Sequence, residues 1–146
     1  MQNPSPHAAK ALSLLTEQHE LLEAVGRLCS AQARLIDENE SEELLAVIEQ
    51  RGLILQKAAE LGAEIDGAIG ALPASDGSLP LIRQRKAAVS ELARAIGRSD
   101  AADTQRLGAK RDELAAELAA MNTNRAATGA YARPTRPGPG FQDTSA

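Results

Sequence analysis

Two side chains of the first third of the chain, His19 and Glu23, have the chemistry to bind a metal ion. They are four residues apart, so on a helix they would lie one above the other on the same face. A structural metal site needs about four ligands, however, and the only other histidine, His7, lies close to the amino terminus. We therefore expect no metal site, and we place His19 at the margin of a helical bundle.

Cys29 is the only cysteine, which excludes an internal disulfide. No histidine lies near it in the sequence to lower the pKa of its thiol, so a buried, inert side chain is expected rather than a nucleophile. Neither a phosphate-binding glycine loop nor paired cysteines with metal-ligand spacing occur in the sequence. We therefore expect a protein that is not an enzyme and has no cofactor.

The composition favours helices. Of the 146 residues, 43% are hydrophobic, much of this share is alanine, and the chain has one tyrosine, one phenylalanine and no tryptophan. Alanine is the strongest helix former, while aromatic and β-branched runs typical of strands are scarce. The net charge of −4 argues against a nucleic-acid partner, which would require a clustered basic face.

Apolar residues follow a seven-residue repeat in the first part of the chain, as adjacent pairs such as Leu14-Leu15 and Leu21-Leu22. Paired positions give a stripe wide enough to touch two neighbouring helices, so the pattern predicts an all-α fold, an antiparallel helical hairpin or a bundle of three to four helices. The predicted helices span about residues 6–37, 41–72, 80–97 and 100–130.

Capping signals set these limits. Ser5-Pro6 is typical of a helix start, and Asn39 or Ser41 would cap the second helix after an acidic turn, unless one bent helix continues through it. Residues 73–80 have the composition of a loop, and the glycine and aspartate of GRSD, residues 97–100, predict a stop followed by a new cap. The sequence leaves open whether the helices on either side of GRSD are continuous. We expect one helical domain over 1–131 and a flexible Pro/Gly-rich tail over 132–146.

The predicted second helix carries an apolar row with alternating spacings of four and three residues. Its members are Leu44, Ile48, Arg51, Leu55, Ala58, Gly62, Ile65, Ile69 and Leu72. Arg51 is the only charged member, which marks it as unusual.

The last predicted helix has a simpler row, made of Leu107, Leu114, Leu118 and Met121. Such a row can pack into a core, which is the default use of this periodicity, or receive an amphipathic helix from another protein. The residues alone leave both uses open. No stretch approaches the ~20 apolar residues that a membrane-spanning helix needs, and the amino terminus has no secretion signal. We therefore expect a cytoplasmic protein without membrane insertion.

Two segments resemble the flagellar export chaperones of the FlgN type, with the FliT type as a near relative. HELLEAVGRLCSAQARLIDENESEELLAVIEQRGLIL, residues 19–55, is similar to the leucine-paired first helix of this family, its acidic turn and a second helix with a charged residue beside a glycine, here Arg51-Gly52. AIGRSDAADTQRLGAKRDELAAELAAMNTNRAATGAY, residues 95–131, is similar to the last helix, which ends in a tyrosine.

The resemblance implies a chaperone that holds the C-terminal amphipathic helix of hook–filament junction proteins and delivers them to the export gate. It implies client contacts at Leu107, Leu114, Leu118 and Met121, and docking of Tyr131 on the cytoplasmic domain of the gate. Phe141 is a further candidate contact in the tail. The alternative is a self-associating structural or adaptor protein without a client, and a homodimer is compatible with either function.

Overall fold

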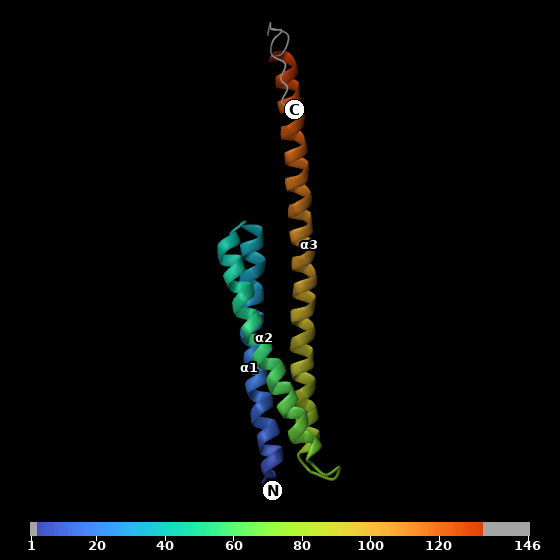
Figure 1. The fold of residues 1–146 in the computed structure, drawn as a ribbon. Helices are drawn as coiled ribbons and strands as arrows, with labels where there is room; N and C mark the ends of the chain where they lie inside the picture. The colour runs from blue at the N-terminus through green and yellow to red at the C-terminus, as the bar shows by residue number, and fades with distance from the viewer. Residues whose placement is uncertain (1–2, 133–146) are drawn as a thin grey trace, which may run out of the picture. The chain divides into compact units, whose positions relative to one another are not determined.

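The protein is all-α, as predicted. The computed structural model describes residues 3–132, and in this range the chain forms three helices and no strand: α1 (Pro6–Asp37), α2 (Ser41–Gly70) and α3 (Leu79–Ala132) (Figure 1). The chain divides into two units, Met1–Arg106 and Leu107–Ala146, which are described separately below. The predicted tail lies outside the described residues, apart from Ala132, which ends α3.

The start of α1 matches the capping prediction. Ser5 is the N-cap, its Oγ accepts a hydrogen bond of 3.2 Å from the backbone N–H of Ala8, and Pro6 occupies the first helical position. The serine oxygen satisfies one of the free N–H groups of the first turn, and proline has no N–H to satisfy there.

A tight turn separates α1 from α2, so the bent continuous helix is excluded. Asn39 has a left-handed backbone with φ of 59°, and the N–H groups of Asn39 and Glu40 donate to the carbonyls of Ile36 and Leu35 at 3.2 and 3.0 Å. This is the Schellman arrangement, in which asparagine is the usual substitute for glycine. The capping prediction for α2 was wrong, because Glu40 is the N-cap and makes no side-chain capping bond, while Asn39 follows Glu38, the C-cap of α1.

A loop joins α2 and α3, as predicted, but it spans residues 71–78 and not 73–80, because α2 ends at Gly70 and α3 begins at Leu79. The N–H of Asp76 donates to the carbonyl of Pro73 at 3.0 Å, and the Asp76 carboxylate accepts from the N–H of Ser78 at 2.8 Å. Asp76 thereby pairs backbone groups of the loop immediately before α3 begins at Leu79.

The predicted break at residues 97–100 does not occur, since α3 is continuous through it, which decides between the two alternatives that the sequence left open. Glycine inside a helix costs about 1 kcal/mol relative to alanine, so Gly97 is a weak stop signal. Contacts of nearby residues offset this cost. Ile96 is buried in the core, Asp100 accepts hydrogen bonds from α2, and Asp103 accepts one from α1. Tertiary contacts therefore override the local signal.

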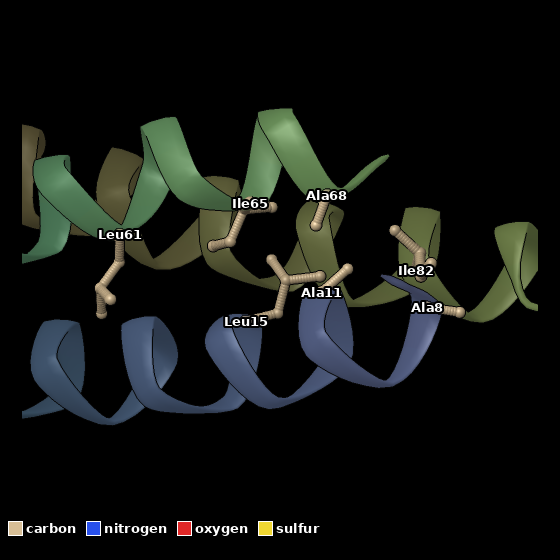
Figure 2. Close-up of a cluster of buried hydrophobic side chains, with 7 residues drawn as sticks. All are labelled: Ala8, Ala11, Leu15, Leu61, Ile65, Ala68 and Ile82. Carbon is tan, nitrogen blue, oxygen red and sulfur yellow. The ribbon is translucent and has the colours of Figure 1, made fainter. Parts of the chain in front are cut away.

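Two apolar clusters form the core of the unit Met1–Arg106. Figure 2 shows the first, in which the alanines of α1 and α2 gather at one end beside Ile82 of α3 and the larger side chains lie toward the other end. Its buried members are Ala8, Ala11, Leu15, Leu61, Ile65, Ala68 and Ile82. The second contains Leu22, Val25, Cys29, Ala58 and Ile96. Alanines let the helix backbones approach closely, so a core without aromatic residues still packs.

Candidate partner-binding surface

His19 and Glu23, the two possible metal ligands of α1, contact each other on the surface of the helix. His19 Nδ1 lies 2.8 Å from Glu23 Oε1, one turn away on α1, and both side chains are exposed. Within residues 3–132, no three histidine, cysteine, aspartate or glutamate side chains are grouped to hold a metal ion. The pair is therefore a helix-surface interaction between neighbouring turns.

Cys29 lies where the sequence places it, in the core. It is buried in the second apolar cluster, and burial is the main reason why the pKa of its thiol is raised. The Arg51 guanidinium opposes this shift without reversing it. The thiol is therefore protonated at neutral pH, the inert form.

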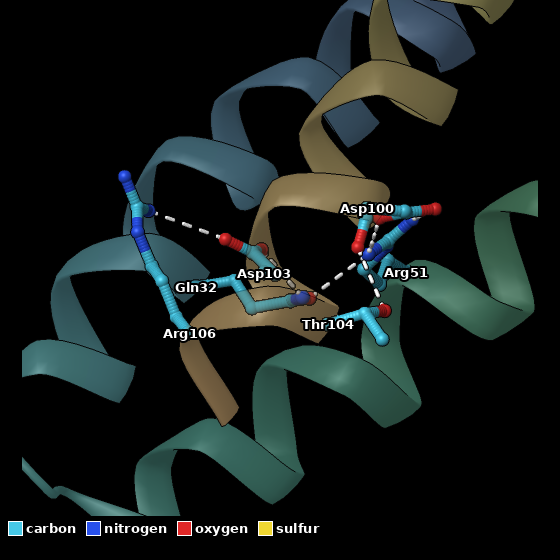
Figure 3. Close-up of polar contacts among 6 residues, drawn as sticks. All are labelled: Gln32, Arg51, Asp100, Asp103, Thr104 and Arg106. Carbon is cyan, nitrogen blue, oxygen red and sulfur yellow. Dashed lines mark hydrogen bonds and ion pairs between the residues drawn. The ribbon is translucent and has the colours of Figure 1, made fainter. Parts of the chain in front are cut away.

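A buried polar layer joins all three helices of the first unit (Figure 3). Arg51 of α2 binds both carboxylate oxygens of Asp100, with Nη1 and Nη2 at 2.7 and 2.9 Å, and Nη1 also donates to Oε1 of Gln32 at 2.9 Å. Gln32 of α1 donates from Nε2 to Asp103 of α3 at 2.8 Å. Arg106 Nη1 lies 3.3 Å from the other oxygen of Asp103.

The charges of this layer are matched. Arg51 is 8% exposed and Asp103 only 2%, and burial without a partner would cost both several kcal/mol. The hydrogen bond to Asp100 raises the pKa of Arg51 above its ordinary value, so the guanidinium stays charged. Its Nε is the one buried side-chain nitrogen or oxygen in the described chain that lacks a hydrogen-bond partner. The layer therefore fixes the helices against each other.

Sequence reasoning found Arg51 but missed its partners. A signal for Asp103 was present, because Ile82, Val89 and Ile96 precede it at seven-residue intervals on α3. A carboxylate at the next position of an apolar series indicates a buried charge that needs a cation. Gln32 gave no comparable signal, since a single glutamine beside a stripe is ordinary on a helix surface.

The second unit presents the predicted partner row as an exposed surface. Leu107, Leu114, Leu118 and Met121 are 44% to 61% exposed, and every residue from 111 to 128 is exposed. At 100° per residue the four side chains fall within an arc of about 60° on α3. Such an arc is the narrow seam typical of contact with a single helix. These residues are therefore not core residues of either cluster described above.

The two aromatic candidates are only partly covered by the structure. Tyr131 lies in the last turn of α3, and its side chain is outside the described residues. Phe141 lies outside them altogether. Their proposed contacts remain predictions.

In the part of the chain that the structure describes, no helix is both long enough and apolar enough to span a bilayer. Comparisons with protein-family models, with curated proteins and with solved structures found no match to this chain. The resemblance to the FlgN-type chaperones therefore stays a prediction, and function must be argued from the exposed row of α3.

Proposed function

We propose that this protein is a cytoplasmic flagellar export chaperone that holds the C-terminal amphipathic helix of a hook–filament junction protein along α3. The supporting observation is the exposed row Leu107, Leu114, Leu118 and Met121, which is 44% to 61% accessible. Isolated exposed leucines are common on protein surfaces, but several apolar side chains in phase on one helix are typical of an interaction site, here with Arg111 between Leu107 and Leu114.

The geometry of the row favours a helical client. A narrow apolar stripe is matched by a second helix with apolar residues at three- and four-residue spacing. Covering the row would contribute about 25 cal/mol per Å² of apolar area, less the cost of ordering the client. A single seam therefore supports modest affinity, which suits a client that must be released at the export gate. Tyr131 is the proposed contact with that gate.

We predict that Leu114→Asp combined with Leu118→Asp abolishes client binding and leaves the fold intact. Both side chains are largely exposed, so the new carboxylates remain solvated in the free protein but would be buried without a partner in the complex. Size-exclusion chromatography with hook–filament junction proteins measures the complex, and circular dichroism measures the helix content.

Leu53→Asp is the matched control, because Leu53 of α2 is 66% exposed and lies outside the row. It should leave binding unchanged. Loss of helix in the double variant would show that the row is structural. A stable homodimer that forms no complex with any junction protein, and that the double variant dissociates, would replace the chaperone with the self-associating alternative.

A further inference from the structure

A second exposed apolar surface lies in the first unit, at the start of α2. We name it the tip patch, because it adjoins the turn between α1 and α2, drawn in cyan in Figure 1. It consists of Leu44, Leu45, Val47 and Ile48. Leu45 is 66% and Ile48 42% exposed, while Leu44 and Val47 are half-buried. The four belong to neither core cluster, so the packing of this unit does not explain the exposed apolar surface of Leu45 and Ile48.

The tip patch is a broad stripe. With 100° per residue, Leu44 and Ile48 lie in the middle, Val47 on one side and Leu45 on the other, over an arc of about 160°. This is wider than a two-helix seam and matches the apolar face of an amphipathic helix that lies across it. A helix start that faces only water does not require apolar residues, because serine or charged side chains would serve there equally well. The apolar side chains of the patch therefore need another explanation.

Carboxylates surround the patch. Residues 37–49 contain six acidic side chains and no lysine, arginine or histidine. Glu43 follows Val47 around the helix on one edge, and Glu49 follows Leu45 on the other, each about 40° further on. The α2 dipole favours acidic residues in the first turn, but Glu49 lies beyond that turn. Glu43 and Glu49 form no ion pair among the described residues, so these two flanking charges are uncompensated.

We propose that the tip patch binds a basic amphipathic helix of another protein, with lysine or arginine on both sides of its apolar face. The apolar arc supplies the contact area and the flanking carboxylates select the charge of the partner. Nucleic acids and anionic lipid surfaces are repelled by the same carboxylates. The tip patch of a second copy is disfavoured for that reason too. This proposal is independent of the function proposed for α3, because the patch lies on a different unit.

The test uses the full chain and a fluorescent helical peptide of about 14 leucine and lysine residues with one apolar face. Fluorescence anisotropy should show binding that weakens with added salt, and a peptide with glutamate in place of lysine should not bind. Leu45→Ser with Ile48→Ser should raise the Kd at least about tenfold. Leu53→Ser is the matched control, since Leu53 has the same 66% exposure on the same helix outside the patch. It should leave the Kd unchanged.

A second pair of variants tests the charge. Glu43→Gln with Glu49→Gln should weaken binding and flatten its salt dependence, whereas Glu60→Gln with Glu64→Gln, two exposed carboxylates further along α2, should not. Equal losses in the patch and control variants would overturn the proposal in favour of non-specific charge attraction. A homodimer that Leu45→Ser with Ile48→Ser dissociates would overturn it in favour of a second copy. Because the α3 row could also bind such a peptide, the measurements are repeated in the Leu114→Asp with Leu118→Asp chain, where binding to the tip patch must persist.

Discussion

Arg51 is the residue on which the packing of the first unit depends most. Its guanidinium is buried and holds Asp100 of α3 and Gln32 of α1 at once. Lysine offers a single point of contact and cannot reproduce the paired bonds to a carboxylate. The arginine therefore gives the three helices one preferred register where purely apolar rows would tolerate sliding.

We predict that Arg51→Ala lowers the free energy of unfolding by about 2–4 kcal/mol, because Gln32 and Asp103 stay buried and the layer loses its buried cation. Urea unfolding monitored by circular dichroism measures the change. Arg34→Ala removes an exposed pair within one helix and should cost below about 1 kcal/mol. Similar losses for the two variants would mean that the buried layer adds no stability.

Cys29 gives a prediction about alkaline pH. Its pKa in the folded protein is raised by burial, so above about pH 8.5 the unfolded chain releases the thiol proton first. The unfolded state then binds fewer protons than the folded state. Below that pH the contribution of Cys29 to stability is complete, and it is lost as the pH rises through the folded pKa. Cys29→Ala should remove this part of the decline in urea-unfolding free energy. An unchanged alkaline slope in the variant would assign the decline to other groups.

At the scale of elements, the turn between α1 and α2 depends on the left-handed backbone of Asn39. We predict that Asn39→Ala lowers the free energy of unfolding by about 1 kcal/mol, since alanine is strained at positive φ, while Asn39→Gly is neutral or stabilising. Ser41→Ala should change little, because α2 has no side-chain capping bond. Thermal unfolding compares the three variants, and a larger loss for Ser41→Ala would restore serine as the cap.

Helix limits were predictable where a local signal acts alone. Ser5-Pro6 begins α1 as capping chemistry predicts, and the loop before Leu79 lies within two residues of its predicted position. The continuity of α3 was not predictable, because a glycine followed by serine and aspartate is locally a stop. Asp100 is instead held by Arg51 from 49 residues away in the sequence. A local signal gives no information on such a contact.

For the whole molecule, the two units carry different kinds of surface. Every residue of both apolar clusters and of the polar layer lies within the first unit, while the second exposes its apolar row. We predict that a chain ending at Lys110 melts within a few degrees of the full chain. The removed residues belong to neither apolar cluster nor to the polar layer, so the loss of stability should be small, and a small loss shifts Tm only slightly. Scanning calorimetry measures Tm, and the shortened chain should no longer bind the client of α3. A collapse of Tm would show that residues 111–146 stabilise the first unit.

The sequence by itself determined the helical fold, the length of α1, the turn and loop positions and the burial of Cys29. These follow from propensity, capping chemistry and seven-residue periodicity, which act over one or two turns of chain. Only the tertiary structure decided which leucines are core and which are exposed, because buried rows and exposed rows of leucines have the same spacing in the sequence. It also decided that Arg51, Gln32 and Asp103 meet in a buried layer, since their partners lie on other helices and periodicity says nothing about which faces meet.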